Sequence, residues 1–555
     1  MTDSAVRPAY VPRGAVPDLG PGSRRSRHSV GALVIAAYLV AAAAVLAVQD
    51  AFSLPRWLAL HLVVLGAASN AVLVYSRHFA QALLHARPTS EWPALLRLGV
   101  FNLGVVAVLT GRSRSLTALA VVGAALVVVA VATHLGSLLA MVWRSTLSGP
   151  LRGVVWFYVA GGAALVAGGT LGGVLVSGAL DSAAWETAVR LAHVHLNLFG
   201  WLGLVVIGTQ FMLWPAVLRT RMAESAPRAA RHVLGLTVSG LVLATGGLLL
   251  TPAGDLGWWA AAAGMTLYAA GVGYSLVPAL VEMRAKRPRS TSAVMLVAGT
   301  TWLLVALVAD IVDLLSDAGG NGGAGDLPGM LVPSLAVGFV AQVVTGAMTF
   351  LLPVTIGGGP RGNKRLTAIL EYGWLARVPA GNLGLLIVVS PAGGDLRLLG
   401  WTLVVLGFGS FTVLVLLAVI TAHRPVAAVP APRSAERSTA GPELLAVCSV
   451  AAVLAVLTLI GTGTWPRGEQ DAVAATTAVS DVPVAVELDE FAMTPSAVSV
   501  APGTRLVLAV RNDGQQSHDL RFEDGRGTRM LDPGESETLD LGVVDHDAKG
   551  WCTVA

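Results

Sequence analysis

Residues 116–142 read LTALAVVGAALVVVAVATHLGSLLAMV and contain no aspartate, glutamate, lysine or arginine. As an α-helix with a rise of about 1.5 Å per residue, this run is about 40 Å long, more than the roughly 30 Å hydrocarbon core of a bilayer. The stretch therefore predicts a transmembrane helix. Of the 555 residues in the chain, 54% are hydrophobic and 13% are charged. A soluble domain carries about twice that charged share, so one large soluble core is excluded.

Similar apolar blocks recur along most of the chain. They lie at 30–49, 57–76, 94–110, 116–142, 153–178, 188–214, 230–251, 256–281, 292–315, 329–353, 371–391, 397–421 and 443–463. Each is about long enough to cross a bilayer as a helix. The sequence thus predicts a polytopic α-helical membrane bundle of about thirteen spans, with the lipid bilayer as its first partner.

Charges in the connecting loops predict the orientation of the bundle. Basic loops such as RTRMAESAPRAARH (219–232) and EMRAKRPRS (282–290) follow the even-numbered spans. Acidic or neutral loops such as DSAAWE (181–186) follow most odd-numbered spans, and GRSRS (111–115) is the exception. By the positive-inside rule the N-terminus is cytoplasmic and the segment after the thirteenth span is outside the cell. The net charge of +4 reflects these loops and does not indicate binding of nucleic acid.

Composition divides the chain into six segments. Residues 1–28 are polar and rich in proline, glycine and arginine, which predicts a disordered cytoplasmic N-terminus. There follow a twelve-span membrane domain (29–425), a cytoplasmic linker (426–442), the thirteenth span (443–463), an external linker (464–481) and a β domain (482–555). The predicted location is the cell membrane, with multiple passes.

The β domain is predicted from alternating apolar and polar residues. The runs VAVELDEF (484–491), RLVLAV (505–510) and ETLDLGV (537–543) alternate in this way, and turn signals such as NDG, EDG and DPG lie between the runs. Short alternating strands with turns of this kind are typical of a small β-sandwich.

Two polar strings in the β domain contain residues that bind metals. SHDLRF (517–522) contains His518, and GWCTVA (550–555) contains Cys552, 34 residues later. A blue-copper site uses two imidazoles and one thiolate, with a weak axial methionine. Taken alone, the pair is better explained by a turn histidine and a small buried cysteine. The other cysteine, Cys448, lies in an apolar span, so a disulfide between the two is not expected.

The flanking strings favour copper. VSVAPGTRLVLAVRNDGQQSHDLRF (498–522), TRMLDPGESETLDLG (528–542) and GWCTVA resemble the cupredoxin domains of multicopper oxidases and copper nitrite reductases. The resemblance implies a Greek-key sandwich with His518 as the first copper ligand and Cys552 as the thiolate ligand. It also implies a second histidine and a methionine after the cysteine, whereas three residues follow here. We therefore expect a sandwich that is incomplete at its C-terminus, with a copper domain continuing beyond residue 555.

Two further residues bear on this resemblance. Copper nitrite reductases place a catalytic histidine five residues after the first ligand, where this chain has Glu523. The domain is therefore expected to transfer electrons, with oxidase or reductase catalysis in the continuation. His546 is an alternative ligand, although a solvated loop histidine is the favoured interpretation.

Four histidines within spans form a second set of candidates, because ionisable residues inside a membrane are costly and commonly functional. They are His61, His134, His193 and His195. The string AHVHLNLFGWLGLVVIG (192–208) resembles the membrane subunit of haem-copper oxidases. The resemblance implies His61 as a haem ligand and His193 or His195 as a metal ligand. The further histidines of that family are absent from the seventh and tenth spans. The alternative is that these histidines only link helices, and for His134 this alternative is favoured.

The ninth span adds two aspartates, Asp310 and Asp313, three residues apart on one helical face. They either line an ion path or mark the outer end of the helix, and the second interpretation is favoured.

The predicted function is that of a membrane-anchored redox protein. An external type 1 copper domain would exchange electrons with a donor or acceptor protein, while haem or copper is a candidate for the membrane bundle. One alternative is a transporter or metal-handling protein with a copper-binding outer domain, although no clear internal repeat supports it. Another alternative is a bundle that merely tethers the copper domain.

Overall fold

A computed structural model describes residues 21–47, 54–86, 92–145, 149, 151–180, 182–319, 331–390, 394–423, 473–474, 484–489, 492–494, 498–499, 504–514, 516–522, 526–544 and 550–552. The chain forms two compact units, Met1–Thr462 and Gly463–Ala555. The first is a helical bundle and the second is built of strands.

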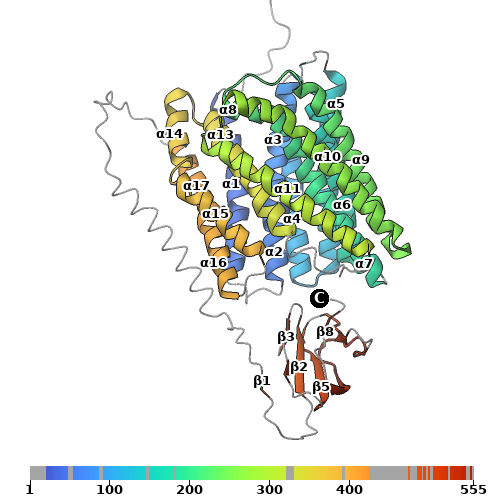
Figure 1. The fold of residues 1–555 in the computed structure, drawn as a ribbon. Coiled ribbons are helices and arrows are strands. Elements are labelled where there is room, and N and C mark those ends of the chain that lie inside the picture. Colours follow the sequence, from blue (N-terminus) through green and yellow to red (C-terminus); the bar gives the residue numbers. More distant parts are fainter. Residues whose placement is uncertain are drawn as a thin grey trace, which may run out of the picture. The chain divides into compact units, whose positions relative to one another are not determined.

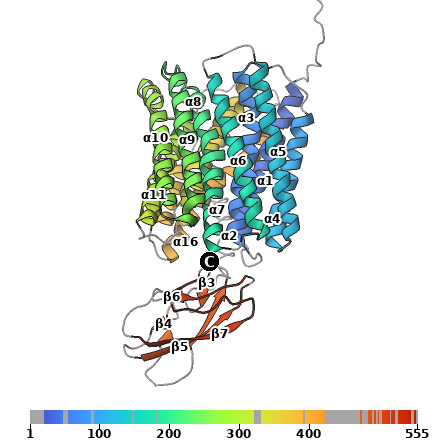
Figure 2. The same cartoon turned by 90° about the vertical axis from the view of Figure 1, so that its right-hand side faces the viewer.

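The helices of the first unit lie roughly side by side (Figures 1 and 2). The α-helices are α1 (Pro21–Ala47), α2 (Pro55–His61), α3 (Ser69–Leu83), α4 (Trp92–Ser113), α5 (Thr117–Arg144), α6 (Val155–Ser177), α7 (Ala183–His195), α8 (Val205–Leu218), α9 (Ala226–Leu250), α10 (Leu256–Ala285), α11 (Thr291–Ala318), α13 (Gln342–Ile356), α14 (Pro360–Leu370), α15 (Trp374–Val389), α16 (Gly394–Val404) and α17 (Ser410–His423). Short 3₁₀ turns, η3 (Arg152–Val154) and η5 (Thr251–Ala253), border α6 and α9.

The predicted membrane bundle is confirmed in its main feature. Within the described residues, ten helices are long and apolar enough to cross a membrane, and the bent pair α14 and α15 brings the number to eleven. α1 contributes the shorter apolar helix Leu33–Val45 at the predicted first span. The predicted thirteenth span, 443–463, lies outside the described residues. We number these spans 1 to 12 in chain order.

One connection differs from its predicted form. The loop expected after span 10 contains the helix α14, which meets α15 at a bend of 43°. Leu366 and Leu370 of α14 are buried, while Arg361, Lys364 and Arg365 are exposed. The helix forms because its apolar residues lie four apart and pack against α13 and α17.

Spans 2, 6, 10 and 12 each contain a π-helical segment, in which the hydrogen bonds run from i to i+5. The segments are η2 (Leu62–Ala68), η4 (Leu196–Leu204), η6 (Ser334–Ala341) and η7 (Val405–Gly409). Such segments are rare and frequently occur at functional sites. Both η2 and η4 contact η6, so the π-helical segments of spans 2, 6 and 10 meet inside the bundle.

A glycine occupies the fifth position in all four of these segments, and in the last of them it is Gly409. Gly66, Gly200 and Gly338 lie five residues after His61, His195 and Pro333, respectively. A Cβ atom on Gly338 would lie 2.6 Å from the Trp302 ring, and one on Gly66 would collide with the Tyr38 ring. These three glycines therefore recur at the same position in spans 2, 6 and 10. The lack of a side chain at this position lets neighbouring helices approach closely. The pattern is too short to be recognised as a repeat from the sequence alone.

A polar network surrounds the first of these glycines and joins spans 1, 2 and 3. Asn70 donates to the carbonyl of Gly66 at 2.7 Å. Asn70 and Asn102 exchange amide hydrogen bonds of 3.0 and 2.9 Å, and the Tyr38 hydroxyl donates to Asn102 at 2.8 Å. The side chains thus supply partners to backbone and amide groups that lipid cannot satisfy.

Spans 9, 10 and 11 repeat this arrangement with different residues. Gln342 donates to the carbonyl of Gly338 at 2.8 Å. Gln342 and Asn382 exchange amide hydrogen bonds of 3.0 and 3.1 Å, and Trp302 Nε1 donates to Asn382 at 2.8 Å. The two networks correspond residue by residue, each around one π-helical segment.

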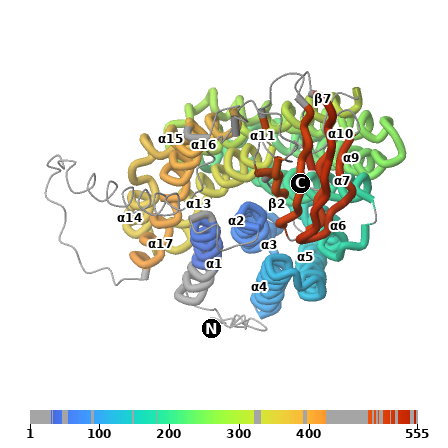
Figure 3. Tube along the Cα trace, turned by 90° about the horizontal axis from the view of Figure 1, so that it is seen from below, coloured from blue at the N-terminus to red at the C-terminus, as the bar shows by residue number. Residues whose placement is uncertain are grey.

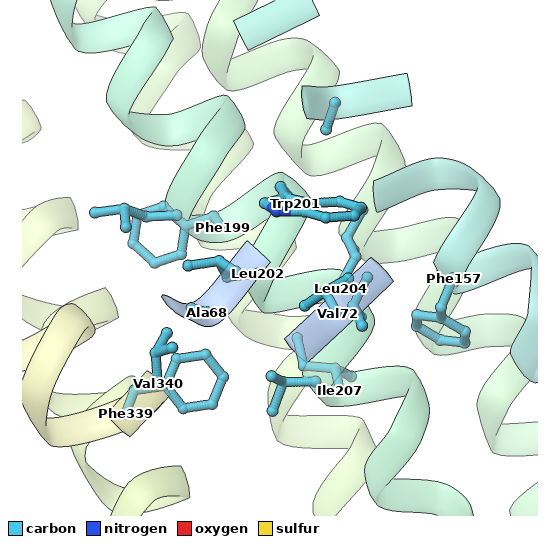
Figure 4. Packing of buried hydrophobic residues seen from close by; sticks show 14 of the residues in the cluster. Ala68, Val72, Phe157, Phe199, Trp201, Leu202, Leu204, Ile207, Phe339 and Val340 are labelled. Atoms are coloured by element: carbon cyan, nitrogen blue, oxygen red, sulfur yellow. The ribbon is translucent and has the colours of Figure 1, made fainter. Parts of the chain in front are cut away.

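The middle copy of the repeat is apolar. A Cβ atom on Gly200 would lie 2.5 Å from the Cβ of Ala164. Figure 4 shows the surrounding core, in which Leu202 and Phe199 of span 6 lie near Ala68 of span 2 and Phe339 of span 10. Viewed along the helices, α14–α17 and α9–α10 form opposite edges of the bundle (Figure 3).

The described residues of the second unit form eight strands. They are β1 (Val473–Ala474), β2 (Val484–Asp489), β3 (Ala492–Thr494), β4 (Val498–Ser499), β5 (Thr504–Asn512), β6 (Arg521–Phe522), β7 (Ser536–Val544) and β8 (Gly550–Trp551). A four-stranded sheet has the order β3-β2-β5-β7, with β2 and β5 parallel, and two-stranded sheets pair β1 with β4 and β6 with β8. The all-β prediction is confirmed at this coarse level.

Alternation of apolar residues explains the core of the second unit. On β5, Leu506, Leu508 and Val510 are buried, as are Val486 and Leu488 on β2. In a strand these positions point to one face. They pack with Leu520, Leu531 and Leu541 from the loops and β7.

Candidate functional site

The second unit brings His518 and Cys552 together. The Nδ1 atom of His518 lies 3.3 Å from Sγ of Cys552. The pairing of β6 with β8, which aligns Arg521 with Trp551, carries Cys552 to the loop that holds His518. The backbone of His518 is fixed from the other side by hydrogen bonds of 3.0 and 2.8 Å with Leu531.

This spacing is slightly shorter than the separation that a bridging metal ion needs. Metal bonds of about 2.3 Å to a thiolate and about 2.0 Å to an imidazole, at a trigonal angle, place sulfur and nitrogen about 3.7 Å apart. His518 is 1% exposed, and its Nε2 has no hydrogen-bond partner among the described residues. Burial of that ring without a full set of partners is costly, and a metal at Nδ1 would use the lone pair that faces the sulfur.

Asn512 organises the loop around His518. Its side chain is fully buried and donates to the carbonyls of Gln516 at 2.6 Å and Leu531 at 2.8 Å. Its Oδ1 accepts from the N–H of Gly514 at 2.9 Å. Because Leu531 pairs with the backbone of His518, Asn512 fixes the position of the imidazole indirectly.

His518 and Cys552 are the only histidine and the only cysteine in the described part of the second unit. Across the described residues, no group of three or more His, Cys, Asp or Glu side chains is arranged to hold a metal. His546 and Glu523 lie outside the described residues.

In the membrane unit, one ring nitrogen of His61 is hydrogen-bonded to the backbone of its own helix. Its Nδ1 lies 2.8 Å from the carbonyl of Trp57, one turn earlier. The ring packs on the indole of Trp57, with centroids 4.2 Å apart. Because a carbonyl only accepts, Nδ1 carries the proton and Nε2 carries a lone pair. His61 is the last residue of α2, directly before η2.

His193 has the same arrangement on span 6. Its Nδ1 lies 2.8 Å from the carbonyl of Gly168 on α6. The amide of Asn197 lies 3.2 Å from that nitrogen but 2.7 Å from the backbone oxygen of His193, and the shorter contact is the one it donates to. His193 therefore also holds its proton on Nδ1 and its lone pair on Nε2. Gly172 touches the ring, and a Cβ there would lie 2.8 Å from it.

His195, two residues later, uses both ring nitrogens. Nδ1 lies 2.8 Å from the carbonyl of Leu191, and Nε2 lies 3.1 and 3.3 Å from the two carboxylate oxygens of Asp310. Both side chains are fully buried. The favoured interpretation, that Asp310 only marks the interfacial end of the helix, is wrong, because the carboxylate is buried against His195 of span 6.

His134 is linked to another helix. Its Nε2 lies 3.0 Å from the hydroxyl of Ser76, and both residues are buried. This contact agrees with the interpretation that His134 joins helices.

One residue of these sites, Asp310, could be recognised from the sequence, and another, Asn512, could not. An aspartate and a histidine inside spans are each a sign of function or pairing, so Asp310 had a detectable signal. Asn512 reads as an ordinary turn residue, and nothing in its local sequence indicates its role. Compared with known proteins, the chain matches no protein-family model and no curated protein.

Proposed function

We propose that the chain is a membrane-anchored redox protein whose outer β unit binds copper through His518 and Cys552 and transfers single electrons. The 3.3 Å contact between Nδ1 and Sγ supports this proposal above all. Thiolate and imidazole together suit copper, which alternates between Cu(I) and Cu(II) by gaining or losing one electron.

A cysteine and a histidine in contact are also the pair found in enzymes with a cysteine nucleophile. In such enzymes the imidazole moves protons to and from the substrate and must reach it. Here the His518 side chain is almost completely buried, which favours metal ligation over proton transfer.

The apolar helices serve as the anchor of this unit in the bilayer. The basic loops after the even-numbered spans support a cytoplasmic N-terminus and an outer β unit. We propose that the electron donor or acceptor is a protein on that outer side, and that further metal in the bundle extends the redox function.

Redox titration of the purified full-length chain tests the proposal. After loading with copper, the chain should show a reversible one-electron transition by optical and electron paramagnetic resonance spectroscopy. C552S and H518A should remove the copper that gives this transition, while C448S, which changes the other cysteine, should retain it. A one-electron transition that is unchanged in both C552S and H518A would contradict the proposal. Copper that binds through Cys552 but cannot be cycled would favour a metal-handling protein instead.

A further inference from the structure

His61 and His193 lie on parallel spans at the same level of the bundle. In Figures 1 and 2, α2 and α7 lie at one end of the helices, and α3 and α8 lie at the other. Spans 2 and 6 are joined by a hydrogen bond of 2.9 Å from Trp201 Nε1 to Ser69 Oγ. Ser69 follows His61 by eight residues, and Trp201 follows His193 by eight.

The two helices are parallel, and each histidine precedes the Ser69–Trp201 contact by eight residues. Both histidines therefore lie at the same level, about 12 Å along the helix axis from that contact. Both histidines also lie at or near the start of a π-helical segment, which changes the direction in which neighbouring side chains point.

The chemistry of the two rings is the same. Each Nδ1 is committed to a backbone carbonyl, and each Nε2 receives no hydrogen bond from a described residue. Imidazoles that bind metals typically donate their second ring N–H to a carbonyl or carboxylate in this way, which fixes the tautomer and the ring orientation. Neither side chain is fully buried.

We propose that His61 and His193 form a second copper site, in which the two Nε2 atoms bind one copper ion within the membrane bundle. Neutral imidazole is a good copper ligand. The choice of copper rests on the proposed function of the outer unit, whereas the choice of ligands rests on the bundle alone.

The other histidines of the bundle do not belong to this site. His195 points to span 9 and has both nitrogens engaged by Leu191 and Asp310. His134 has its Nε2 on Ser76. The sequence leaves His193 and His195 as alternatives, and the hydrogen bonds select His193.

Close packing around His193 holds its imidazole in one position, which supports its role as a ligand. Gly168 and Gly172 lie one turn apart on α6, against Asn197 and His193 respectively. Glycine at both positions lets α6 approach span 6 and supplies the carbonyl that orients the imidazole.

Metal analysis in the C552S background tests this site, because the outer site is then removed. The full-length chain, loaded with Cu(II) and desalted, should retain one copper ion per chain. H61N and H193N should each lose it, and the double variant should lose no more than either single variant. H134N is the matched control and should retain the copper. Electron paramagnetic resonance should show nitrogen ligands that disappear in the same variants.

Rescue by free imidazole distinguishes the loss of a ligand from the misfolding of a variant. In H193G, added imidazole should restore copper binding, whereas an unfolded variant would not recover. Copper that persists in both H61N and H193N would overturn the proposal. A Soret band that is lost in H61N would also overturn it, since the pair would then hold a haem. Either failure leaves the test of Cys552 unaffected, so the two proposals fail separately.

Discussion

His195 and Asp310 form a fully buried pair between spans 6 and 9, with Nε2 3.1 Å from Oδ1. Because Nδ1 of His195 faces the carbonyl of Leu191, that nitrogen carries a proton. A second proton lies between Nε2 and the carboxylate, since two lone pairs would repel each other. The pair is therefore neutral as a unit, and this makes its burial in the bundle tolerable.

Removal of one partner should be costly. D310A would leave His195 without its acceptor, and breaking a buried ion pair typically costs about 3–5 kcal/mol. D310N keeps a hydrogen bond to Nε2 and should cost less. Thermal unfolding in detergent measures both, with D255A at an exposed position as the control. If D310A unfolded like D255A, the pair would have no structural role.

Gly66 and Gly338, which touch aromatic rings, should not accept a methyl group. In G338A the new Cβ would lie 2.6 Å from the Trp302 ring, and overpacking of this kind costs about 1–3 kcal/mol. G66A, against Tyr38, should behave similarly.

Gly246 of α9 provides the control for these glycines, because nothing lies within 4 Å of a Cβ there. G246A should stabilise the helix by about 1 kcal/mol through higher helix propensity. Unfolding curves should therefore show lower stability for G338A and G66A and higher stability for G246A. A stabilised G338A would contradict the close contact with Trp302.

Asn512 should determine both the stability of the outer unit and its metal affinity. N512A removes three hydrogen bonds and strands buried carbonyls, at a cost of about 1–3 kcal/mol. Hydrogen exchange measured by mass spectrometry should rise across Gln516–Leu531. Copper affinity should fall although no ligand is changed.

A nearby hydroxyl serves as the matched control for Asn512. Ser517 adjoins His518 but bonds to the exposed carboxylate of Asp532 at 2.7 Å, so S517A should leave exchange and affinity nearly unchanged. Equal effects of N512A and S517A would show that Asn512 does not position His518.

Much of the architecture was predictable because lipid imposes strict demands on sequence. The run 116–142 corresponds to α5, Thr117–Arg144, since only a continuous apolar helix satisfies its backbone in a bilayer. The contact of His518 with Cys552 was also predictable, from the strings that flank each residue.

Contacts between distant spans were not predictable from one sequence. Asp310 is 115 residues from His195, and its three-residue spacing from Asp313 is equally typical of a helix end. The π-helical segments depend on side chains such as Asn70 and Gln342 that take up freed carbonyls. Their hydropathy is that of ordinary spans, so periodicity gives no sign of them.

X-ray absorption at the copper edge tests the central claim, that Cys552 and His518 bind copper together. The full-length chain carrying H193N leaves only the outer site to be filled. We predict one sulfur neighbour at about 2.3 Å and nitrogen at about 2.0 Å, with the sulfur lost in C552S. A copper environment of nitrogen and oxygen alone, unchanged by C552S, would contradict the account.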